Sequence, residues 1–150
     1  MNGWLLAATV ELGGAGAAAL WGTATGPLPR RVMAQNLATS AVCPALLLLA
    51  QGYGRPSYVD LALLMALLGP VGTLVFARLL ADDLADEPPW AWGLTWAAVG
   101  LATTVVVAVC VATGPSRAML KLLVIGALLI GGNVVASRAL AGGFRAVRGA

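Results

Sequence analysis

Five uninterrupted apolar runs of membrane-spanning length are the feature that most constrains the fold. A transmembrane helix needs about 20 mostly apolar residues, and the runs occupy residues 4–23, 32–49, 58–80, 90–111 and 118–140. They lack the polar–apolar alternation of transmembrane barrel strands, and a helix satisfies its own backbone hydrogen bonds in lipid. The sequence therefore predicts an all-α integral membrane protein with five transmembrane helices.

Charge and composition exclude several other classes. Only 10% of the residues are charged, against roughly 25% in soluble domains, and the 60% hydrophobic content excludes disorder. The nine Lys and Arg residues are scattered and the net charge is +3, so no nucleic-acid partner is expected. The chain has no histidine, and Cys43 and Cys110 lie in apolar runs without adjacent ligands. We therefore predict no metal, no cofactor and no enzymatic activity.

Short connectors join the runs, and one of them divides the chain. Residues 82–89, with the sequence DDLADEPP, form the only strongly polar stretch. We predict a three-helix part over residues 1–81, an acidic cytoplasmic connector over 82–89 and a two-helix part over 90–150.

The distribution of basic residues predicts the orientation. With five crossings, one side holds six basic residues and the other holds three: Arg30, Arg31, Arg78, Arg138, Arg145 and Arg148, against Arg55, Arg117 and Lys121. The positive-inside rule places the richer side in the cytoplasm, with the N-terminus outside and the C-terminus inside. Arg30, Arg31 and Arg78 are then cytoplasmic anchors at the lipid headgroups. The Arg-, Ala- and Gly-rich composition favours a bacterial source, hence a multi-pass protein of the bacterial inner membrane.

Two acidic residues are candidates for an ion or proton path. Glu11 lies inside the first run, where a charged acid costs roughly 2.5–3.5 kcal/mol. It is either a protonation or cation site, or a carboxyl bonded to a neighbouring subunit. Asp60 begins the third run. It either favours the helix dipole from the first turn or stands at the mouth of an ion path.

Uncharged candidates lie deeper. Pro70 and Thr73 are candidates for a helix break: Pro70 frees the carbonyl of Ala66, and such breaks can present backbone oxygen to an ion. Alternatively, Pro70 only kinks the helix, and its glycine neighbours allow close packing. Asn36, a further ion-path candidate, and Asn133 are also positioned for hydrogen bonds between helices.

Four motifs carry a resemblance to a known family: Gly26-Pro27, then RRVMAQN at 30–36, YVDLAL at 58–63 and GTLVFAR at 72–78. With them, the first ~80 residues resemble the F subunit of Mrp-type multisubunit cation/proton antiporters, a family with three spans. The family carries aspartates where this chain has Arg30 and Asn36. Asp60 matches the family pattern, whereas Glu11 is not part of it.

Residues ~90–150 also resemble the last two helices of the G subunit of the same antiporters, through the runs at 120–126 and 133–140. The first helix of that family and its loop are missing. This second resemblance implies a truncated fusion of F-like and G-like parts.

The resemblance implies an accessory membrane subunit of a monovalent cation/proton antiporter of the Na⁺/H⁺ type, contributing to assembly and to the cation path. Its partners would be other membrane subunits and the bilayer, with Na⁺ or another monovalent cation and H⁺ as transported ions. One alternative is a structural subunit of a complex-I-like or hydrogenase-type oxidoreductase. Another is an independent small exporter, since small multidrug transporters also carry a glutamate in their first helix.

Overall fold

The computed structural model describes residues 2–79 and 90–139. Over these ranges the chain forms five helices: α1 (Gly3–Ala24), α2 (Leu28–Tyr53), α3 (Ser57–Leu79), α4 (Trp90–Thr113) and α5 (Arg117–Arg138). All five are long and apolar enough to cross a membrane. The described residues thus confirm the predicted all-α fold with five candidate spans.

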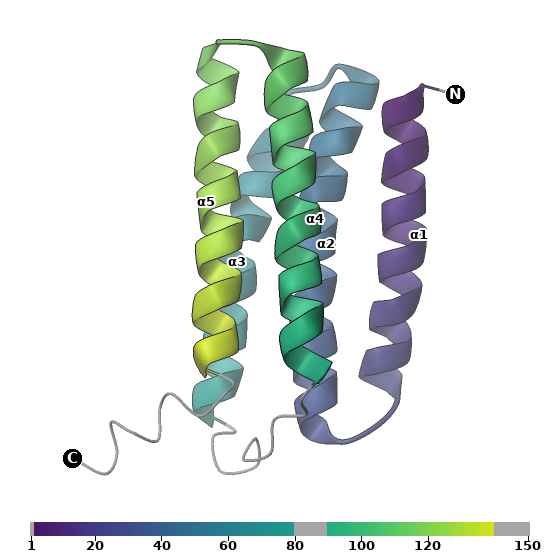
Figure 1. The fold of residues 1–150 in the computed structure, drawn as a ribbon, viewed down its shortest axis with the longest axis vertical. Helices are drawn as coiled ribbons and strands as arrows, with labels where there is room; N and C mark the ends of the chain where they lie inside the picture. Colours follow the sequence, from purple (N-terminus) through teal and green to yellow (C-terminus); the bar gives the residue numbers. More distant parts are fainter. Residues whose placement is uncertain (1, 80–89, 140–150) are drawn as a thin grey trace, which may run out of the picture.

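The helices form an up-and-down bundle in which each one runs antiparallel to the one before (Figure 1). Each of the three described turns contains a glycine with a positive φ angle: Gly26, Gly54 and Gly114. Glycine adopts this conformation without steric cost because it has no Cβ. Turns this short keep consecutive helices side by side.

Helix α2 is longer at both ends than its apolar run predicts. It begins at Leu28 and therefore includes Pro29, because a proline in the first turn loses no intrahelical hydrogen bond. It ends at Tyr53 and is capped by Gly54, whose N–H donates to the carbonyl of Ala50 from a left-handed conformation. Residues 51–53, expected in the connector, are consequently helical.

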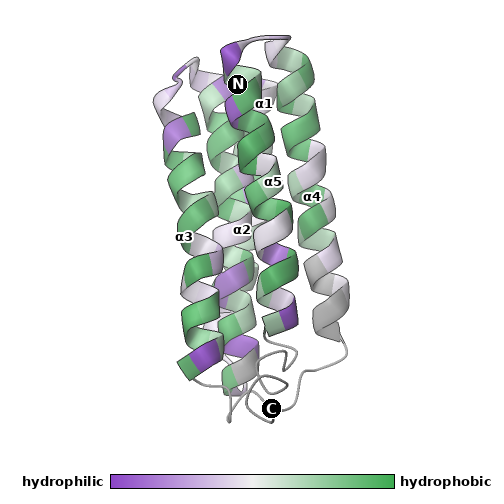
Figure 2. Cartoon of the chain, turned by 90° about the vertical axis from the view of Figure 1, so that its left-hand side faces the viewer, coloured by the Kyte–Doolittle hydropathy of each residue, from purple (hydrophilic) through white to green (hydrophobic). Residues whose placement is uncertain are grey.

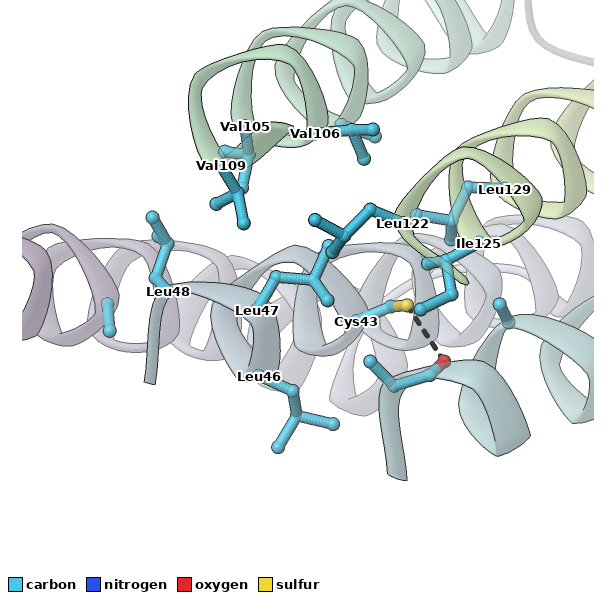
Figure 3. Packing of buried hydrophobic residues seen from close by; sticks show 14 residues of the cluster. Cys43, Leu46, Leu47, Leu48, Val105, Val106, Val109, Leu122, Ile125 and Leu129 are labelled. Carbon is cyan, nitrogen blue, oxygen red and sulfur yellow. Dashed lines mark hydrogen bonds between the residues drawn. The ribbon is translucent and has the colours of Figure 1, made fainter. Parts of the chain in front are cut away.

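Helix α2 is the centre of the bundle. Among the described helices it contacts all four others, whereas α1 contacts α2 alone. In Figure 3 leucines of α2, valines of α4 and large apolar residues of α5 belong to one buried cluster, and the Cys43 thiol donates to the carbonyl of Ala62 in α3 at 3.1 Å. Cys43 and Leu47 are fully buried. Packing between helices therefore depends mainly on the middle of α2.

Apolar residues predominate along the helices (Figure 2). Large exposed hydrophobic residues occur on α1, α3, α4 and α5, among them Leu20, Leu64, Val111 and Leu120. Soluble monomers rarely expose continuous apolar patches larger than a few hundred Å². Such a surface suits contact with lipid and with other membrane-embedded chains.

The bundle sorts its basic residues to its two ends as predicted. The end with the α1–α2 turn carries Arg30, Arg31, Arg78 and Arg138, and the opposite end carries Arg55, Arg117 and Lys121. Which end faces the cytoplasm stays a prediction from the positive-inside rule. The acidic connector at 82–89, Arg145 and Arg148 lie outside the described residues. The two parts of the chain pack together through α2–α4 and α3–α5 contacts.

Candidate functional site

Four polar side chains are buried together where α2, α3 and α5 meet. Asn36 and Ser40 come from α2, Thr73 from α3 and Asn133 from α5, and their exposed fractions are between 3% and 8%. Asn36 and Ser40 share one face of α2 because residues four apart lie one above the other. We call these four residues the polar cluster.

Hydrogen bonds link the polar cluster across the three helices. The Thr73 hydroxyl lies 2.9 Å from Asn36 Oδ1, and Asn36 Nδ2 donates to Asn133 Oδ1 at 3.3 Å. The Ser40 hydroxyl lies 2.9 Å from the same Asn133 oxygen. Asn133 Nδ2 is buried without a hydrogen-bond partner among the described residues. The cluster therefore retains an amide nitrogen whose N–H groups are unused.

A small cavity of about 10 Å³ adjoins the polar cluster and is lined by Asn36, Ser40, Asn133 and the Gly69–Pro70 segment, among others. This is about the volume that one water molecule needs. The polar cluster therefore connects three helices around a space for about one water molecule, and a role of Asn36 in an ion path stays a prediction.

The helices approach one another closely at the level of the polar cluster. A Cβ atom on Gly69 would lie 2.6 Å from Thr39 Cγ2 of α2, and one on Gly132 of α5 would overlap the ring of Pro70. Small residues allow such close backbone approach. The two glycines thus set the spacing of α3 against α2 and α5.

Helix α3 continues from Ser57 to Leu79 with Pro70, a candidate for a helix break, inside it. A proline removes one backbone donor, and neighbouring helices and hydroxyl side chains satisfy the freed polarity in a membrane helix. The Thr73 hydroxyl lies 3.1 Å from the carbonyl of Gly69, close to the proline. Pro70 itself packs against Gly132.

Asp60 lies at the opposite end of the bundle from Arg30 and is paired. Its Oδ1 lies 2.8 Å from Nζ of Lys121 in α5, and the two side chains are 60% and 56% exposed. The acid also occupies the first turn of α3, where it favours the helix dipole. The pairing with Lys121, 61 residues away, is a contact that the sequence alone did not suggest.

We expect that breaking the ion pair between Asp60 and Lys121 by mutation has a small effect on the stability of the bundle. Exposed pairs contribute about 0.2–1 kcal/mol, so Asp60→Asn should lower the free energy of unfolding by less than about 1 kcal/mol. A double-mutant cycle with Lys121→Gln, measured by thermal unfolding in detergent, gives the coupling. A coupling well above this range would show that the pair is a main connection between α3 and α5.

Glu11 lies on α1, away from the polar cluster and from Asp60. Its side chain lines a groove between α1 and α4, whose other residues include Val10, Leu48, Leu101 and Thr104. Glu11 Oε1 is buried and has no hydrogen-bond partner within the described residues. The three predicted ion-path residues, Glu11, Asp60 and Asn36, are therefore not brought together.

The predicted arginine anchors lie at one end of the bundle. Arg31 and Arg78 are exposed, and Arg30 is half-buried beside the α1–α2 turn. Arg31 Nε donates to the carbonyl of Gly26 at 3.2 Å. Arg78 is in the last turn of α3, where a cation favours the helix dipole.

Ser40 is the member of the polar cluster that sequence reasoning missed. Its spacing of four residues from Asn36 was the available signal, because that spacing places both side chains on one helical face. Asn133 reaches the polar cluster because of the way α5 is rotated about its own axis, and the sequence pattern does not predict that rotation.

Comparison with known families gives one match. Residues 29–81 match the model of the family described as Multiple resistance and pH regulation protein F (MrpF / PhaF). No curated protein and no solved structure gives a significant match. The match confirms the resemblance to the F subunit over α2 and α3, about a third of the chain. These helices supply Asn36, Ser40, Thr73 and Asp60, whereas the G-subunit resemblance stays a prediction.

Proposed function

We propose that this chain, with an MrpF-type segment at residues 29–81, is an accessory membrane subunit of a multisubunit monovalent cation/proton antiporter. The observation that carries the proposal is that the matched segment coincides with the α2–α3 hairpin. That hairpin includes the central helix of the bundle and three of the four polar-cluster residues.

Exposed apolar faces support a role within an assembly. Half of the residues in the apolar stretch of α2 are buried within the chain. In the apolar stretches of α1 and α3, only 11% and 17% are buried. The outer helices therefore leave most of their apolar surface to lipid and to other membrane subunits. We place the complex in the bacterial inner membrane, with the Arg30 end of the bundle in the cytoplasm.

The described titratable groups favour a contribution to assembly and to the edge of the ion route over independent transport. Asp60 is paired with Lys121 at the bundle end, and the polar cluster contains only uncharged side chains. Glu11 is the acid within the described spans whose carboxyl retains an unpaired buried oxygen. We therefore retain Glu11 as the candidate for contact with the transported proton or cation.

The test of this function is purification of the tagged chain with its native partners from the membrane. We expect large antiporter subunits to co-purify, and Na⁺/H⁺ or K⁺/H⁺ exchange in vesicles to be lost on deletion of the chain and restored by the wild-type copy. Co-purification of redox subunits with metal centres would replace this proposal by the oxidoreductase alternative. Transport by the isolated chain would replace it by the exporter alternative.

Point variants in the assembled complex test the ion path itself. Glu11→Gln keeps the shape of the side chain but cannot carry charge, so we expect transport to fall by about tenfold, equivalent to about 1.4 kcal/mol of ion or proton binding. Asp60→Asn serves as the comparison, since an exposed paired acid should change transport much less. Unchanged transport and pH profile in Glu11→Gln, with assembly intact, would exclude Glu11 from the path.

A further inference from the structure

An unpaired amide nitrogen of α5 lies in the interior of the bundle. Asn133 is 3% exposed, and its Oδ1 is the acceptor for Asn36 Nδ2 and for the Ser40 hydroxyl. Its Nδ2 is buried and has no hydrogen-bond partner among the described residues. Because the chain itself encloses these N–H groups, neither a lipid nor a side chain of another subunit reaches them from outside.

Pro70 leaves a carbonyl of α3 without its usual donor. In an α-helix the carbonyl of each residue accepts from the N–H four residues later, and a proline at that position has no N–H. Since Pro70 lies inside α3, it frees the carbonyl of Ala66. Ala66 is 1% exposed, so the freed oxygen also lies in the interior of the bundle.

The cavity of about 10 Å³ beside the polar cluster adjoins both groups. Asn133 of α5 and Pro70 of α3 line it, and Asn36 and Ser40 line it from α2. The freed carbonyl of Ala66 points along α3 toward Pro70, as helix carbonyls point toward the residue four positions later. A cavity of about 10–15 Å³ holds one water molecule, which needs about two to four polar partners. The cavity therefore has the size and the polar neighbours for one water.

The chemistry of the unpaired groups selects the occupant. The N–H groups of Asn133 need an acceptor, which a metal cation does not offer, and the carbonyl of Ala66 needs a donor. The polar cluster contains only uncharged side chains, so none of its members would balance an anion. Water supplies an acceptor and a donor in one small neutral molecule, whereas a dry cavity would leave both buried groups unpaired and unfavourable.

We infer that one water molecule is bound in this cavity, accepting a hydrogen bond from Asn133 Nδ2 and donating one to the carbonyl of Ala66. The water connects α5 to α3 at the level where Gly132 packs against Pro70. Pro70 then has two effects, because its ring contacts α5 and its missing N–H provides the acceptor for the water. The inference does not rest on the proposed function, since it concerns the interior of this chain alone.

Solid-state NMR of the full chain in lipid vesicles tests the inference. The sequence has three asparagines, Asn2, Asn36 and Asn133, so labelling with ¹⁵N-asparagine gives three side-chain amide signals. Polarisation transferred from water protons should reach Asn2, which is exposed, and also Asn133. The transfer to Asn36 should be weaker, because its Nδ2 is bonded to Asn133 Oδ1. Absence of transfer to Asn133, while Asn2 gives a signal, would overturn the inference.

Exchange of Pro70 tests the second hydrogen bond. Pro70→Ala restores a backbone N–H that takes the carbonyl of Ala66, so the ratio of occupied to empty sites should fall about fivefold, the equivalent of one hydrogen bond. Pro44→Ala is the matched control: Pro44 lies inside α2 and is fully buried, but it is not among the described residues that line the cavity. Unchanged transfer to Asn133 in Pro70→Ala, or an equal fall in both variants, would overturn the bridge to Ala66.

An experimental density map of the wild-type chain gives a test that does not depend on either variant. At a resolution that shows ordered water, a peak is expected within hydrogen-bond distance of Asn133 Nδ2, about 2.7–3.2 Å. An empty cavity, or a peak that Asn133 Nδ2 does not contact, would contradict the inference and leave the proposed function intact. Failure of antiporter subunits to co-purify would have the opposite effect, because the water is held within one chain.

Discussion

Replacing Gly132 by leucine is expected to destabilise the bundle by about 2–3 kcal/mol, the largest effect expected for a single exchange in this chain. A Cβ atom at Gly132 would overlap the ring of Pro70, so α5 and α3 must separate to admit any larger side chain. Over-packing a filled core typically costs 1–3 kcal/mol and occasionally more. Thermal unfolding of the full chain in detergent measures the change.

Gly131→Leu is the matched control for this prediction. A Cβ atom at Gly131 would meet no atom within 4 Å, and both exchanges gain the same helix propensity of about 0.8 kcal/mol over glycine. The control should therefore be neutral or slightly stabilising. Equal stabilities of the two variants would show that α3 and α5 are not held together at the Pro70–Gly132 contact.

We expect Asn133→Leu to destabilise the bundle by about 1–3 kcal/mol. The exchange removes the acceptor of Asn36 Nδ2, which is then left unpaired in the interior. The Ser40 hydroxyl loses the same acceptor, but it also lies 2.9 Å from the carbonyl of Asn36. The penalty therefore comes mainly from the stranded amide of Asn36, and unfolding of the full chain in detergent measures it.

Asn36→Leu should cost less than Asn133→Leu. The Thr73 hydroxyl keeps the carbonyl of Gly69 as an acceptor, and Asn133 Nδ2 has no described partner even in the wild-type chain. The double variant should be less destabilised than the sum of the two single ones, because removing both partners leaves no new orphan. A larger cost for Asn36→Leu, or additive effects, would contradict this hydrogen-bond pattern.

The five helices could be predicted from sequence because lipid leaves a continuous apolar run no other way to satisfy its backbone. The positions at which the helices begin and end were predicted less accurately from hydropathy. Helix α2 extends through Pro29 and Gln51, since a proline in a first turn and a polar residue in a last turn are both compatible with helix at the membrane surface. The match at residues 29–81 agrees with the motifs around Asn36, Asp60 and Gly72.

The candidate site was predictable only as single residues. Asn36 and Asn133 were recognised as polar groups between helices, but their contact joins residues 97 apart. Hydropathy has almost no angular signal in helices that are apolar all round, so it does not give their rotation about their own axes. For the same reason the pairing of Asp60 with Lys121, and the position of Glu11 beside α4, required the packed structure.

The order in which the helices are synthesised determines when the hydrogen bonds of the polar cluster can form. Asn36 and Ser40 leave the ribosome early, yet the acceptor on α5 with which both pair is added only after nearly a hundred more residues. Until α5 inserts, the Asn36 amide lacks this acceptor, whereas the Ser40 hydroxyl still has the carbonyl of Asn36. A polypeptide truncated before α5 should therefore leave Asn36 Nδ2 without the acceptor that the finished polypeptide provides.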